Sequence, residues 1–132
     1  MVFAALAISS LGPAGDYTMQ WAAIILALAA LGGLTLAGIR LSGVPRPPTW
    51  LALGHGAIAA TGLGFFAYDA ATSTIPALAQ ISLAVLVLAA LGGFTLFAGF
   101  HLREKALPIP LVIGHGIAAI TGYVLLLVSL YS

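Results

Sequence analysis

The sequence contains no cysteine and very little charge. Four of its 132 residues are Lys or Arg and three are Asp or Glu, so charged residues make up 5% of the chain and hydrophobic residues 62%. The missing thiols exclude disulfides, cysteine-bound iron–sulfur clusters and covalently attached c-type haem. The shortage of charge excludes a soluble globule, which needs more polar residues to cover its surface. The net charge of +1 says nothing useful about partners; no nucleic-acid partner is expected.

The apolar residues fall into four uncharged stretches, each long enough to cross a bilayer as a helix. Prolines before the second and fourth stretches, and Ser73 or Thr74 with Pro76 before the third, mark helix starts. We therefore predict an all-α fold, an integral membrane four-helix bundle, with helices over about 17–41, 50–69, 74–102 and 108–131. These helices form one domain, 17–132, and residues 1–16 are expected to form an interfacial or flexible arm. The bilayer is the expected environment.

The chain is internally duplicated with an offset of sixty residues. Residues 20–70 align on 80–130 without a gap, and eighteen of the fifty-one positions are identical. The fold is therefore predicted to consist of two parallel repeats of a transmembrane hairpin, related by an axis along the membrane normal. The second and fourth helices then run in the same direction at matched depth.

All four cations fall in the connections after the first and third helices: Arg40, Arg46, Arg103 and Lys105. The positive-inside bias places these two loops in the cytoplasm and both termini outside. A multi-pass protein of the cell inner membrane is expected.

The same tripeptide, Gly-His-Gly, occurs once in each repeat, around His55 and His115. Both histidines lie near the start of their helices, about 8 Å below the cytoplasmic interface, and are expected to face the bundle axis. The paired glycines Gly32-Gly33 and Gly92-Gly93 lie at a similar depth on the first and third helices. Two readings stay open for these glycines: they make room for a guest, or they serve close packing between helices.

Two neutral imidazoles on opposite sides of an axis, with backbone free of side chains nearby, suit a flat macrocycle containing iron. The ligand expected from this pattern is one haem b, with His55 and His115 as metal ligands. Threonines at 35, 61, 95 or 121 are expected to orient the imidazoles through hydrogen bonds. The basic loop residues lie on the side where haem propionates would meet cations. The full set of cofactor-binding residues expected is Gly32, Gly33, Gly54, Gly56, Gly92, Gly93, Gly114, Gly116, Arg40, Arg46, Arg103 and Lys105.

The pattern resembles the haem-holding bundle of respiratory cytochrome b and its smaller dihaem relatives, which have histidines on the second and fourth helices and glycines on the first and third. The resemblance covers the four-helix region and implies haem b between His55 and His115, with Gly32, Gly33, Gly92 and Gly93 lining the ring. Those families generally place two histidines on each ligand helix for two stacked haems. This chain has one per helix.

The expected function is that of a membrane b-type cytochrome, which carries single electrons as a subunit or partner of a larger redox system or with a quinone. A homo-oligomer is the alternative assembly. No catalytic residues are expected, because the only acids are Asp16, Asp69 and Glu104 and no catalytic triad or phosphate loop is present. Alternatives are a small transporter that relays protons or a metal through the histidines, a structural assembly subunit, and a protein binding one chlorophyll at each histidine. His101 has no counterpart in the first repeat and is expected to be solvated at the interface, or else to exchange protons near a quinone or propionate.

Overall fold

The computed structural model describes Val2 and residues 17–132. The arm predicted over 1–16 therefore lies, except for Val2, outside the described residues. Within 17–132 the chain is all-helical, with four long helices and no strand. The elements are α2 (Thr18–Leu41), α3 (Thr49–Thr72), α4 (Ala77–Phe94), which continues directly into a π-helical segment η1 (Thr95–His101), and α5 (Ile109–Tyr131).

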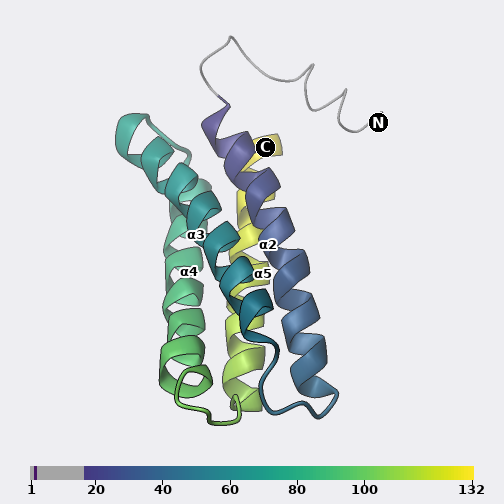
Figure 1. Cartoon of the computed structure of the whole chain (residues 1–132). Helices are drawn as coiled ribbons and strands as arrows, with labels where there is room; N and C mark the ends of the chain where they lie inside the picture. Colours follow the sequence, from purple (N-terminus) through teal and green to yellow (C-terminus); the bar gives the residue numbers. More distant parts are fainter. Residues whose placement is uncertain (1, 3–16) are drawn as a thin grey trace.

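The four helices run alternately up and down and form a closed bundle (Figure 1). α2 packs against α3 and α5, and α4 packs against the same two helices, so α3 and α5 lie diagonally opposite each other. The loops 42–48 and 102–108 lie together at one end, next to the four cations. We call this the basic end; the start of α2 and the end of α5 lie at the opposite end.

Each helix, with α4 and η1 taken together, is long and apolar enough to cross a membrane. Large hydrophobic side chains such as Leu28, Leu88 and Ile117 are more than half exposed on the outside of the bundle. A surface of this kind is stable against lipid tails and unstable in water. The fold therefore agrees with the predicted contact with a bilayer.

The helix limits differ from those predicted around the connection between α3 and α4. α3 continues to Thr72, and α4 begins only at Ala77, behind Pro76. Ser73 does not start α4: its hydroxyl donates to the carbonyl and carboxylate oxygens of Asp69 and so closes the end of α3. The hydrogen bond to the preceding turn extends α3 beyond the expected limit.

Contacts within the pair α2 and α3 recur within the pair α4 and α5. Leu26 packs on Gly62 and Leu86 packs on Gly122, and in each case a Cβ on the glycine would lie less than 3.0 Å from the leucine Cγ. The two helices of each pair therefore approach closely only because these positions are glycine. The sixty-residue duplication of the sequence is thus matched by a duplication of contacts.

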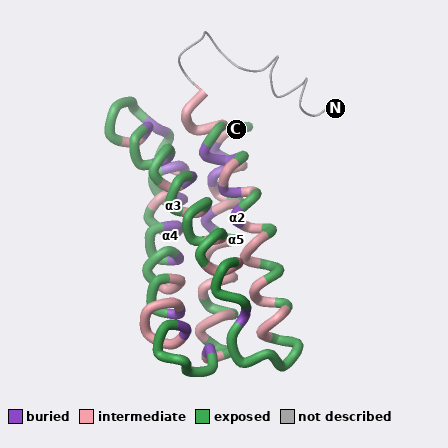
Figure 2. The backbone as a smooth tube through the Cα atoms, in the orientation of Figure 1, coloured by how far each residue is buried: buried purple, intermediate pink, exposed green. Residues whose placement is uncertain are grey.

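The buried core occupies only part of the bundle's length (Figure 2). It ends with one small buried residue on each helix: Ala29, Gly62, Ala89 and Gly122. Buried residues reappear only near the basic end, at Pro47, Leu96, His101 and Leu107. Between these two levels no residue is buried; we call this stretch the open layer, and it comprises 30–41, 49–61, 90–95 and 109–121. Three of the helices thus run for more than three turns without a buried residue, and α4 does so over the six residues 90–95. Protein interiors are normally close-packed, so this layer is the least buried part of the bundle's length.

Candidate functional site

His55 and His115 meet inside the open layer. Each is the seventh residue of its helix, α3 or α5, so the two lie at the same depth. Their ring centroids are 6.2 Å apart and the ring planes are nearly perpendicular, at 87°. Both side chains are half-buried. The structure therefore brings together the two residues that the sequence singled out as metal ligands.

Each imidazole is held by a backbone carbonyl of the neighbouring helix. Nδ1 of His55 lies 2.8 Å from the carbonyl oxygen of Ala29, and Nδ1 of His115 lies 2.7 Å from that of Ala89. A carbonyl oxygen can only accept, so Nδ1 carries the hydrogen in each neutral ring and Nε2 keeps its lone pair. No hydrogen-bond partner for either Nε2 lies in the described part of the chain. Two acceptors cannot bond to each other, so neither Nε2 can satisfy the other while both rings are neutral.

The distance between the rings distinguishes two kinds of metal coordination. In a metal complex each Nε2 lies about 2 Å from the metal, and each ring centre lies roughly 1.1 Å beyond its Nε2. The two ring centres are then about 6.3 Å apart if both Nε2 atoms and the metal lie on one line, and about 5 Å apart if the angle at the metal is tetrahedral. The observed 6.2 Å matches the collinear arrangement. Among the described residues no group of three or more His, Cys, Asp or Glu side chains could hold a metal. At this place the described residues therefore offer two imidazoles and no third His, Cys, Asp or Glu side chain.

The glycines on α2 and α4 make room for the imidazoles themselves. A Cβ on Gly33 would lie 2.9 Å from Cε1 of His55, and a Cβ on Gly93 would lie 2.9 Å from Cε1 of His115. For Gly32 and Gly92 the nearest histidine atoms would be at 3.6 and 3.8 Å, which is ordinary contact. The two members of each glycine pair therefore have different surroundings, and their role in lining a haem stays a prediction.

The glycines that flank the histidines lie in a different environment. A Cβ at Gly54, Gly56, Gly114 or Gly116 would meet nothing within 4 Å. These positions are not required to be glycine by any contact among the described residues.

The expectation that threonines orient the imidazoles is wrong for three of the four. Thr35, Thr61 and Thr95 each donate to the carbonyl four residues earlier in their own helix. The carbonyls of Ala29 and Ala89 orient the rings instead. The sequence gives no signal for this, since every residue carries a carbonyl group.

Two of the four basic residues, Arg40 and Arg46, contact backbone carbonyls, and Arg46 is exposed all the same. Nε of Arg40 donates to the carbonyl of Leu107 at 2.8 Å, which ties the end of α2 to the loop before α5. Nη1 of Arg46 lies 3.4 Å from the carbonyl oxygen of His101. Arg103 and Lys105 are exposed on the loop 102–108.

His101 is buried, contrary to the expectation of a solvated interfacial histidine. It is 4% exposed, whereas Leu41, which occupies the matching position of the first repeat, is 54% exposed. The difference follows from η1: Leu102 and Lys105 donate to carbonyls five residues earlier, and this wider turn rotates the end of the helix relative to the regular α2. The ring of His101 stacks on Phe97, with centroids 5.4 Å apart. Its Nε2 lies 2.9 Å from the hydroxyl oxygen of Thr49.

Comparison of the chain with protein-family models, with curated proteins and with solved structures gives no match.

Proposed function

We propose that the chain is a membrane b-type cytochrome in which His55 and His115 hold one haem from opposite sides. The observation that carries this proposal is the histidine pair itself. Two imidazoles lie at the separation of opposite ligands, each with Nδ1 committed to a carbonyl oxygen. They lie in a layer where no residue is buried. A planar macrocycle would supply the four coordination positions that two protein ligands leave.

Haem bound in this way supplies reversible one-electron chemistry at its iron. A haem held by both His55 and His115 would leave its iron no position for oxygen or peroxide, so electron transfer is the activity that fits. The chain's residues keep the two rings in place. The carbonyls of Ala29 and Ala89 fix their tautomer and orientation, and Gly33 and Gly93 leave them the space they occupy.

The same proposal accounts for the basic end. Haem carries two carboxylates, which in a membrane protein must reach water or cations. Arg40, Arg46, Arg103 and Lys105 offer cations at that end of the bundle. We propose that the helices span the inner membrane as two parallel repeats, with the basic end in the cytoplasm by the positive-inside bias. A redox subunit, a second copy of this chain or a quinone would then exchange electrons with the haem.

The distance between the rings also bears on the pigment alternative. A separation of 6.2 Å between the ring centroids is close to what two imidazoles on one shared iron would need. This favours one shared haem over two chlorophylls, each bound by its own histidine. The alternative function is a relay of protons or of a bare metal ion through the histidine pair. An absorption spectrum distinguishes this alternative from the cytochrome.

The test is the visible spectrum of the purified protein in mild detergent, oxidised and then reduced with dithionite. We expect a low-spin b-type spectrum that is lost in His55→Ala and in His115→Ala. It should persist in His101→Ala, because that histidine belongs to a separate cluster. A colourless protein after expression with ample haem would contradict the proposal, and so would a low-spin spectrum that survives either substitution of the pair.

A further inference from the structure

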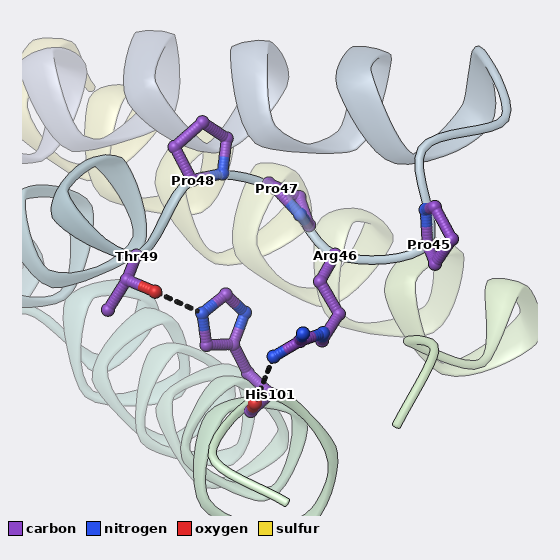
Figure 3. Close-up of a pocket in the computed structure, with 6 residues that line it drawn as sticks. All are labelled: Pro45, Arg46, Pro47, Pro48, Thr49 and His101. Atoms are coloured by element: carbon purple, nitrogen blue, oxygen red, sulfur yellow. Dashed lines mark hydrogen bonds between the residues drawn. The ribbon is translucent and has the colours of Figure 1, made fainter. Parts of the chain in front are cut away.

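A second polar site lies at the basic end, where the loop before α3 meets the end of η1 (Figure 3). A pocket of about 360 Å³ opens there, lined by Pro45, Arg46, Pro47, Pro48, Thr49 and His101. Three prolines form stiff apolar walls, and the remaining three residues bring polar groups. The pocket has the size of a small-ligand site.

His101 presents an unpaired nitrogen at this pocket. Although the residue is 4% exposed, only Nε2 has a partner, the hydroxyl of Thr49. No hydrogen-bond partner for Nδ1 lies within residues 17–132. In Figure 3 the second ring nitrogen faces away from Thr49, toward the side on which Arg46 lies. Nδ1 is not sealed off from solvent, so it is the polar atom of this otherwise buried side chain that a ligand in the pocket can reach.

The surrounding residues fix the ring and leave its hydrogen-bonding character adjustable. Phe97 stacks on the imidazole, and Arg46 holds the carbonyl of the same residue, so the ring stays in one orientation. The hydroxyl of Thr49 can either donate to Nε2 or accept from it. In the first case Nδ1 bears a hydrogen and binds a carbonyl oxygen. In the second case Nδ1 has a lone pair and binds a hydroxyl group.

We propose that this pocket binds the headgroup of a lipid-soluble quinone or quinol, with one ring oxygen on Nδ1 of His101. A quinone has carbonyl oxygens and a quinol has hydroxyl groups, which are the two partners that Nδ1 can bind in the two cases above. The apolar ring of either form suits the proline walls of the pocket. The guanidinium of Arg46 adds a positive charge beside the oxygen as that oxygen loses its proton. Thr49 precedes His55 by six residues on α3, about 9 Å along the helix axis, so a quinone here lies close to the histidine pair. The proposal rests on the proposed function, in which that pair holds haem.

Oxidation of a quinol in the pocket balances as follows. Two O–H bonds break, and the aromatic diol becomes a dione. The two electrons would leave one at a time to a ferric haem held by His55 and His115, and the redox subunit or second quinone proposed above would have to take the first electron from the haem before the second could follow. One proton passes to Nδ1 of His101 and from there to water at the mouth of the pocket, and the other leaves the second oxygen directly to water.

The two tryptophans of the chain provide a binding assay that does not depend on haem. Trp50 adjoins Thr49 and is 74% exposed, whereas Trp21 lies near the start of α2 at the opposite end. In a Trp21→Phe background the fluorescence therefore reports on the pocket. Titration with decylubiquinone, and separately with menadione, should quench it saturably with at least one of the two.

The expected effect of His101→Ala and of Thr49→Val is a loss of quinone affinity of about tenfold, as for one hydrogen bond. Glu104→Gln, on the exposed loop 102–108, is the control and should bind like the parent. With haem bound, the corresponding quinol should reduce the iron at least tenfold more slowly in His101→Ala, while dithionite reduces both proteins alike.

Equal or non-saturable quenching in the parent and in both pocket variants would overturn the quinone site. Loss of the haem spectrum in His101→Ala would also overturn it, because the pocket would then belong to the haem. If the wild-type protein binds no haem but quenching is saturable and sensitive to His101, the proposed function fails and the binding site stands.

Discussion

Adjacent glycines on α4 should respond very differently to the addition of one methyl group. In Gly93→Ala the new Cβ would lie 2.9 Å from Cε1 of His115, 3.3 Å from Nδ1 and 3.5 Å from Nε2. Carbon atoms in contact prefer at least about 3.5 Å, so the ring must retreat by roughly 0.5 Å. The ring cannot do so freely, because Nδ1 is held at 2.7 Å from the carbonyl of Ala89. In Gly92→Ala the nearest atom, Cβ of His115, would be at 3.8 Å and nothing need move.

Overpacking of this kind costs about 1–3 kcal/mol, which corresponds to a loss of haem affinity of about 5- to 140-fold. The assay is titration of the haem-free protein in detergent with hemin, followed by the absorption band of bound haem. Gly33→Ala should behave like Gly93→Ala, since its Cβ meets His55 at the same distance. Gly114→Ala, whose Cβ meets nothing within 4 Å, is a further control. Equal affinity in Gly93→Ala and the parent, or equal losses in Gly92→Ala and Gly93→Ala, would refute the argument that the imidazole needs this space.

Two further predictions concern packing away from the histidines. Gly122→Ala should lower the free energy of unfolding of the bundle by about 1–3 kcal/mol, because its Cβ would lie 2.7 Å from Cγ of Leu86. Unfolding in detergent measures this loss, and the loss in the double variant with Leu86→Ala should be smaller than the sum of the two single losses. Strictly additive losses would mean that the two positions do not compete for space. Arg40→Ala should speed tryptic cleavage of the loop 102–108 at Arg103 and Lys105, because it removes the hydrogen bond from Nε to the carbonyl of Leu107. Unchanged cleavage kinetics relative to the parent would show that this bond does not restrain the loop.

The sequence was sufficient for the features that repeat. The four helical stretches, the duplication and the pairing of His55 with His115 follow from apolar length and from an exact sixty-residue offset, and the structure brings the two rings together. Hairpins of the same sequence pattern fold alike, so matched positions arrive at matched depth. The identity of a bound group is a different matter, and haem stays a prediction.

What the sequence could not supply depends on helix rotation and on backbone groups. The acceptors for the histidines are carbonyls of Ala29 and Ala89, and one alanine carbonyl is chemically like any other. The burial of His101 depends on the wider turns of η1, which change the face on which the last residues of the helix lie. The sequence holds one local signal for the burial of His101. The matching position of the first repeat is Leu41, so a titratable side chain stands in the second repeat where the first has an apolar one.

The two halves of the histidine pair are built separately, and this affects how a ligand would bind. The contact that fixes His55 lies wholly within α2 and α3, and the contact that fixes His115 lies wholly within α4 and α5. Each hairpin thus carries a finished half-site. The 6.2 Å separation of the rings depends instead on how the hairpins dock, for which the hydroxyl of Tyr123 supplies one link by donating to the carbonyl of Ala23. The open layer contributes no buried residue of its own to this docking. A metal bonded to both rings would therefore stabilise the assembled bundle relative to the separated hairpins. The free energy of metal binding would then add to the free energy of folding.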